Sequence, residues 1–134
     1  LGQLFLIHFA ADQLSHYPEN ELSIKFAGRF EKMEPVDLYT AAVAGNEIAI
    51  DILKYAGEKL GYAIVNYVHI LDIRTIIVSG GVSRAGDFIL EPARKAALSR
   101  LMDPFKPEFQ ILFESQGNDI ALLGAGSLAI EIRP

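Results

Sequence analysis

Apolar positions along this chain repeat with two different periods, and the change of period separates helices from strands. Residues 47–71 carry apolar side chains at a spacing of three and four, which predicts a long helix with a buried stripe. Residues 75–78 and 109–113 are short apolar runs typical of buried strands. The remaining pattern predicts helices over residues 1–14, 38–44, 91–101 and 120–132, and residues 21–30 fit one further short helical stretch.

Proline, glycine and asparagine mark the boundaries between these segments. Pro18 lies in a predicted break over residues 15–20, because proline lacks an amide hydrogen. The pair Gly45 and Asn46 is expected to end the preceding helix in left-handed conformations. Gly86 and Pro92 are expected to bracket the connection into helix 91–101.

The predicted order of elements is several helices, then strand, helix, strand and helix. A right-handed crossover through residues 91–101 would make the two strands parallel neighbours, which indicates an α/β fold. Two parallel strands do not form a stable sheet by themselves. We therefore expect another chain, or a segment outside these residues, to complete the sheet.

Composition and charge exclude several classes of protein. The chain has 134 residues, 51% of them hydrophobic, which fits one globular domain. Its net charge of -5 argues against direct contact with nucleic acid. The absence of cysteine excludes disulfides and thiolate zinc sites and fits a cytoplasmic location.

No targeting or membrane segment is expected from the sequence. The first residues lack the basic region of a signal peptide, and charged residues interrupt the longest apolar helix. The start at Leu1, rather than at a methionine, leads us to expect a piece of a longer protein.

A glycine pair directly after the first strand is the main candidate for a binding site. The run Ile76-Ile77-Val78-Ser79-Gly80-Gly81-Val82-Ser83 ends a β-branched stretch at two residues that have no Cβ. Ligands of open α/β sheets bind outside the carboxyl ends of the strands, where this pair falls. A tight turn without a ligand is the alternative explanation of the same motif.

A second glycine-rich stretch, residues 117–127, gives the last predicted helix a nearly flat face. Such a face permits either close packing on a strand or close approach of a ligand. Neither a GxxxxGK[ST] phosphate loop nor a GxGxxG dinucleotide motif is present.

Candidate catalytic side chains are scattered along the sequence. The histidines have no metal-ligand spacing, and Ser79 and Ser83 have no histidine or acid near them in sequence. The basic cluster of Lys25, Arg29 and Lys32 is most simply a solvated helix face. Four carboxylates are possible acid or base groups: Asp51, Asp72, Asp87 and Asp119. Of these, Asp72 fits a turn and Asp119 fits a helix cap. We find no credible catalytic base in the sequence.

Taken in order, five stretches resemble the carboxyl-terminal half of the ROK family of repressors and sugar kinases. They are AGNEIA at 44–49, LGYAIVN at 60–66, IIVSGGVSRAG at 76–86, LEP at 90–92 and GNDIALLGA at 117–125. The resemblance makes residues 1–134 the carboxyl-terminal part of such a domain, with a weakly matched helical segment at 1–35 and a core at 36–134.

This resemblance implies a ribonuclease H-like, actin-like ATPase α/β lobe, in which a partial sheet is flanked by helices and a long central helix. In that family the strand and its glycine pair form the adenosine motif. Gly80, Gly81, Val82 and Ser83 would then bind the nucleotide. The full protein would use ATP with magnesium and a sugar, bound together with an amino-terminal lobe, and homo-oligomers are expected.

Several family features are absent from these residues. They include the amino-terminal phosphate loop, the catalytic aspartate and the zinc site, and Asp72-Ile73-Arg74 replaces the usual Asp-Pro-Glu. We therefore expect this chain to be one half of a glucokinase-like hexose kinase and to be inactive by itself. The alternatives are the sugar-sensing domain of a ROK transcriptional repressor, or a plain α/β domain whose glycines serve packing only.

Overall fold

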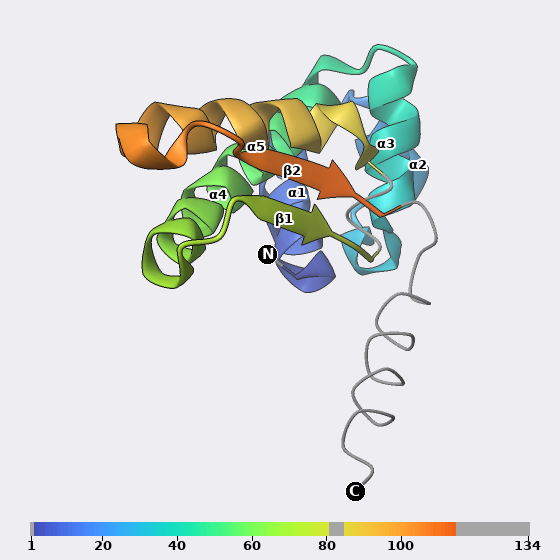
Figure 1. Cartoon of the computed structure of the whole chain (residues 1–134). Helices are drawn as coiled ribbons and strands as arrows, with labels where there is room; N and C mark the ends of the chain where they lie inside the picture. Colours follow the sequence, from blue (N-terminus) through green and yellow to red (C-terminus); the bar gives the residue numbers. More distant parts are fainter. Residues whose placement is uncertain (1, 81–84, 115–134) are drawn as a thin grey trace, which may run out of the picture.

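A 25-residue helix, α4 (Glu47–Leu71), forms the centre of the computed structural model, which describes residues 2–80 and 85–114 (Figure 1). Asn46 begins α4, because its side-chain Oδ1 accepts a hydrogen bond from the Ala49 amide at 3.1 Å. Asp72 ends it in a left-handed conformation, with φ +51°. The predicted bounds of the long helix and the turn role of Asp72 are confirmed.

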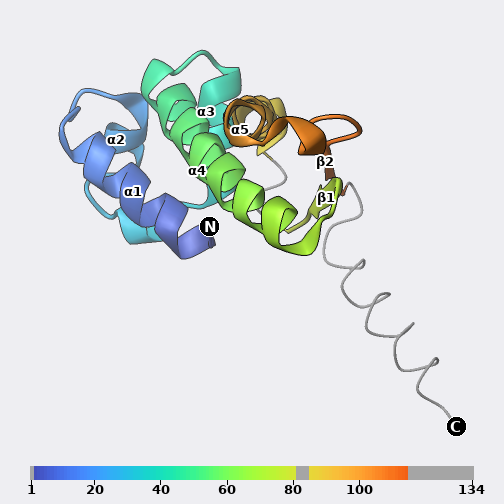
Figure 2. The ribbon, with the colours of Figure 1, turned by 60° about the vertical axis from the view of Figure 1, so that its left-hand side comes forward.

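Of the amino-terminal helices, the first two lie on one side of α4 in Figure 2, whereas the third lies on the other side, with Tyr39 edge-on to Phe88. Their side chains and the first half of α4 share a core that includes Leu6, Leu14, Leu38 and Leu53. The predicted break around Pro18 is confirmed, while residues 27–30 lie outside the short second helix. These elements are α1 (Gln3–Ser15), α2 (Glu21–Phe26), η1 (Phe30–Lys32) and α3 (Pro35–Val43).

Two parallel strands, β1 (Thr75–Val78) and β2 (Gln110–Phe113), form the sheet. The helix α5 (Asp87–Arg100) and the short η3 (Asp103–Phe105) connect them. The register places Ile76 opposite Ile111 and Ile77 opposite Leu112. The predicted strand–helix–strand unit with parallel neighbours is therefore confirmed, within a described part that is mostly helical.

Both α4 and α5 lie on the same face of this sheet (Figures 1 and 2). Ile76 and the fully buried Ile111 belong to the core on that face. On the opposite face Ile77 and Leu112 remain 56% and 44% exposed. The completion of the sheet by further protein remains a prediction, and these two side chains show where a cover would lie.

Two predicted boundaries are wrong. The helix α5 begins at Asp87 rather than near residue 91, so Pro92 lies inside the helix and Gly86 precedes its first residue. Of the pair Gly45 and Asn46, only Gly45 has a positive φ, +91°, whereas Asn46 begins α4 at φ -68°. The helix α5 thus begins earlier than the local pattern indicates, whereas α4 begins where it was predicted and Asn46 serves as its cap.

The predicted helix over residues 120–132 and the glycine-rich stretch 117–127 lie outside the described residues. Within the described ranges, no helix combines the length and the apolar composition that a membrane span needs.

Candidate functional site

The two strands end together at the edge of the sheet where the glycine pair was predicted to act. The Glu114 amide, just after β2, donates a hydrogen bond to the Val78 carbonyl at 3.0 Å. This bond fixes the last residue of β1 against its neighbour. Ser79 is exposed beyond that point, and Gly80 is half-buried.

Gly80 has a backbone conformation and an environment that suit a binding turn. Its φ is +92°, a value that side-chain-bearing residues rarely adopt. No atom of the described residues, apart from the chain neighbours of Gly80, lies within 4 Å of the position that a Cβ would occupy. Among the described residues, no side chain therefore fills the position beside Gly80 where a Cβ would lie.

The start of α5 follows at the other end of this turn. Gly86 has φ +54° and ψ -135°, and a Cβ there would also meet nothing within 4 Å. Its carbonyl accepts hydrogen bonds from the amides of Ile89 and Leu90 at 3.1 and 3.0 Å. Gly86 was expected from the sequence only to bracket the connection into the next helix, whereas it directly precedes the first residue of α5.

The remaining members of the predicted site, Gly81, Val82 and Ser83, lie outside the described residues. The structure therefore places Gly80 at the carboxyl end of β1 and leaves the contribution of the other three as a prediction.

The predicted acid or base candidates are not brought together. Asp51 lies in the first half of α4, and Asp72 at its end pairs with Arg74 at 2.6 Å. Asp87 is exposed in the first turn of α5, and Asp119 lies outside the described residues. Each of the three described carboxylates occupies a different place in the fold, so they form no catalytic pair.

The histidines have structural surroundings. His69, on α4, accepts a hydrogen bond at Nε2 from the Met102 amide at 3.3 Å and packs edge-on against Phe105. It therefore ties the end of α4 to η3. His16 contacts the Asp12 carbonyl at 2.9 Å, and His8 is exposed. Residues 2–80 and 85–114 hold no cluster of three potential metal ligands.

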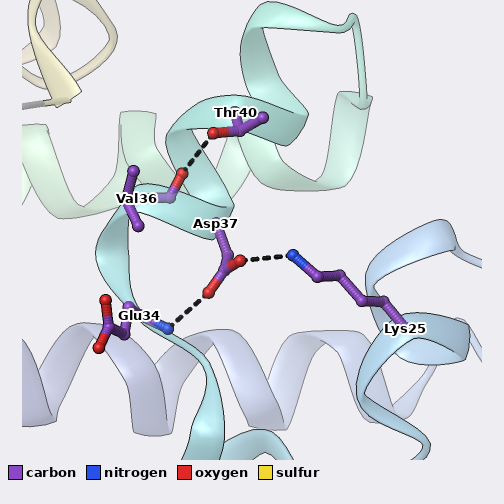
Figure 3. A network of polar contacts seen from close by, with 5 residues as sticks. All are labelled: Lys25, Glu34, Val36, Asp37 and Thr40. Atoms are coloured by element: carbon purple, nitrogen blue, oxygen red, sulfur yellow. Dashed lines mark hydrogen bonds and ion pairs between the residues drawn. The ribbon is translucent and has the colours of Figure 1, made fainter.

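The carboxylate of Asp37, in the first turn of α3, has a defined polar role, shown in Figure 3. Asp37 accepts hydrogen bonds from the Lys25 ammonium at 2.6 Å and from the Glu34 amide at 2.9 Å. Burial acts to raise the pKa of Asp37, but the bonds from Lys25 and Glu34 outweigh it and hold this pKa below its ordinary value. This group caps α3 and links it to α2, so it is structural.

Comparison with known proteins places these features in a wider context. The sequence model of the ROK family matches residues 15–132. The chain is 30% identical over 112 residues to a glucokinase of Thermotoga maritima, and the aligned region covers 84% of this chain and 35% of that relative. It is 29% identical over 127 residues to a glucokinase of Halalkalibacterium halodurans, with 92% and 37% covered.

Solved structures give a similar result. A protein from Cytophaga hutchinsonii that is assigned as a sugar kinase superposes with a TM-score of 0.84 at 26% identity, over 96% of this chain and 42% of that one. A ROK family glucokinase from Streptomyces griseus, solved in complex with glucose and AMPPNP, gives a TM-score of 0.77 at 27% identity, over 92% and 40%. The chain thus spans less than half the length of these relatives.

Proposed function

The chain belongs to the ROK family, and from this premise we propose that it is the carboxyl-terminal, adenosine-side half of an ATP-dependent hexose kinase. The relatives named above as glucokinases, one of them bound to glucose and AMPPNP, support a kinase rather than a repressor. The observation that carries the proposal is the turn at Gly80 just after β1, where φ is +92° and no described side chain fills the Cβ position.

The described residues fit one part of a nucleotide site. A strand end without a side chain at Gly80 leaves space for a flat adenosine, and the first turn of α5 points its amides toward the same edge. Gly81, Val82 and Ser83 would complete the contact. The exposed Asp87 carboxylate in that first turn disfavours a phosphate group directly beside it, so adenosine is the better fit for this half.

ATP would supply the phosphoryl group, with magnesium, and the hydroxyl of a hexose would accept it. Phosphoryl transfer depends mainly on positioning and on charge stabilisation, and it requires both sides of the cleft. This chain's part would be to hold and orient the nucleoside. We therefore expect the purified chain to phosphorylate no glucose in a coupled assay, and measurable turnover would refute its assignment as an incomplete half.

The test of the proposal is a titration of the chain with MgADP, followed by the amide NMR signals. We expect the signals of Gly80 and Gly86 to shift on binding, and Gly80→Ala to weaken the affinity about tenfold because the substitution strains the turn.

Gly28 provides a matched control. It too has a positive φ, +80°, and open space at its Cβ position, but it follows α2 on the far side of α4. Gly28→Ala should cost similar stability and leave MgADP affinity unchanged. Equal affinity in all three proteins, or no binding by the unaltered chain, would overturn the proposal.

A further inference from the structure

The helices α4 and α5 approach each other more closely than side chains normally allow. A Cβ at Gly57 would lie 2.4 Å from the Ile89 carbonyl oxygen, and one at Gly61 would lie 2.3 Å from the Ala93 carbonyl oxygen. Contacts below 3.0 Å do not occur for real Cβ atoms. The two helices therefore meet backbone to backbone, along a seam that only glycine permits on α4.

The pairing of these contacts fixes the direction of the seam. Gly57 meets Ile89, and Gly61, one turn later on α4, meets Ala93, one turn later on α5. The helices thus run side by side in the same direction. Gly57 faces the first turn of α5, whereas Gly61 faces the second.

That first turn is directly connected to the proposed nucleotide site. Ile89 is the third residue of α5, and its amide donates to the Gly86 carbonyl at 3.1 Å. Ile89 is fully buried, Ala85 is 2% exposed, and both share the core of α4 side chains that includes Leu53. The first turn of α5 is therefore held against α4 at Gly57, and the end of β1 is held by the hydrogen bond between the Glu114 amide and the Val78 carbonyl.

We propose that Gly57 is a positioning residue for the nucleotide site, because it sets how deeply the first turn of α5, which follows Gly86, lies against α4. What binds at that turn rests on the proposed function. The positioning itself rests only on the contact between Gly57 and Ile89.

A methyl group at Gly57 would force the separation from 2.4 Å to at least 3.0 Å. Because the amino-terminal helices share a core with α4 and hold it in place, we expect the displacement to fall mainly on the first turn of α5. A methyl group at Gly61 would displace α5 one turn farther along, past the connection to Gly80. The two substitutions therefore add the same methyl group where the nearest atoms of α5 are similarly close, at 2.4 Å for Gly57 and 2.3 Å for Gly61. They differ in how far along α5 that contact lies from its first turn.

The experiment compares Gly57→Ala with Gly61→Ala in the whole chain, using thermal unfolding, the amide signal of Gly80 and MgADP affinity. We expect both variants to lose comparable thermal stability. Gly57→Ala should move the Gly80 signal and weaken MgADP binding about tenfold, whereas Gly61→Ala should change affinity by less than about twofold. Equal effects of the two variants on Gly80 and on affinity would overturn the positioning role.

The Gly80 signal separates this proposal from the proposed function. If the unaltered chain binds no MgADP, the function fails, while a Gly80 signal that moves only in Gly57→Ala still supports the positioning role. Should Gly57→Ala not fold, the unaltered chain carries the test, because coupling between two sites is reciprocal. MgADP should then shift the amide signal of Gly57 and not that of Gly61, and an unshifted Gly57 signal would contradict the proposal.

Discussion

Asp37 shows how a single side chain joins two helices of the amino-terminal part. It lies in the first turn of α3, where a negative charge is favoured by the helix dipole, and it satisfies the Glu34 amide before the helix. Its second oxygen binds the ammonium of Lys25 at the end of α2. The carboxylate is therefore useful to the fold only while it is ionised.

We expect Asp37→Asn to lower the free energy of unfolding by about 1 kcal/mol at pH 7, the usual value of a helix cap. Because the folded pKa of Asp37 is lowered, its ionised form stabilises the fold above the unfolded pKa, near pH 4. This contribution disappears as the pH falls through the folded pKa. Denaturant unfolding from pH 7 down to pH 3 should show the two proteins converging.

Asp103→Asn is the control for this prediction. Asp103 also pairs with a lysine, Lys106 at 2.7 Å, and the hydrogen bond from that lysine likewise lowers the pKa of Asp103. Its side chain is 91% exposed, so solvent screens the pair and no measurable stability change is expected. A loss in Asp103→Asn equal to that in Asp37→Asn would show that the capping position is irrelevant.

At the scale of elements, two helix starts far apart in sequence are joined by one pair of amides. Asn20 caps α2 through the Leu22 amide, and Asn46 caps α4 through the Ala49 amide. The two side chains also exchange hydrogen bonds with each other, both at 3.1 Å. Each asparagine therefore holds the other in its capping orientation.

This arrangement predicts that the two caps are energetically coupled. Asn20→Ala and Asn46→Ala should each cost about 1 kcal/mol of stability, and the double variant should cost less than their sum by at least about 0.5 kcal/mol. Thr40, whose hydroxyl donates only to the Val36 carbonyl of its own helix, supplies the comparison. Asn20→Ala and Thr40→Ala should be additive in urea unfolding, and additivity in both pairs would contradict the coupling.

The success of sequence reasoning at this scale depended on whether the signal was local. The bounds of α4 were predictable because the long apolar stripe lies within the segment itself and the turn at Asp72 directly follows it. The start of α5 was not, because Pro92 normally breaks a helix by removing a hydrogen bond. Pro92 is nevertheless accommodated inside α5, where it packs beside Gly57. Gly57 lies 35 residues away in the sequence, so no local pattern reveals this contact.

The candidate site follows the same division. Gly80 was predictable because the apolar run before it ends in glycine, and the structure places it at the end of β1 with open space beside it. The roles of Gly57 and Gly86 could not be read from spacing, since they depend on how α5 packs against α4. Sequence reasoning thus finds a glycine in a conspicuous local motif more readily than one whose role depends on packing between distant segments.

At the scale of the whole molecule, the sheet is covered on one face and bare on the other. Ile77 and Leu112 lie opposite each other on the bare face, and both are about half exposed. An apolar cross-strand pair beside a strand edge is a surface to which other protein binds readily. For this chain alone in solution, we propose that a second copy covers it, as the expected homo-oligomer requires.

This proposal predicts that the chain self-associates as its concentration rises, and that Ile77→Lys reduces the association by placing a charge on the bare face. Ile24→Lys is the matched control, because this substitution introduces the same charge at a residue that is 66% exposed on α2, away from the sheet. Light scattering across a concentration series should show a lower mean mass for Ile77→Lys only. A chain that stays monomeric at every concentration, or equal effects of both lysines, would show that the sheet face is not the contact.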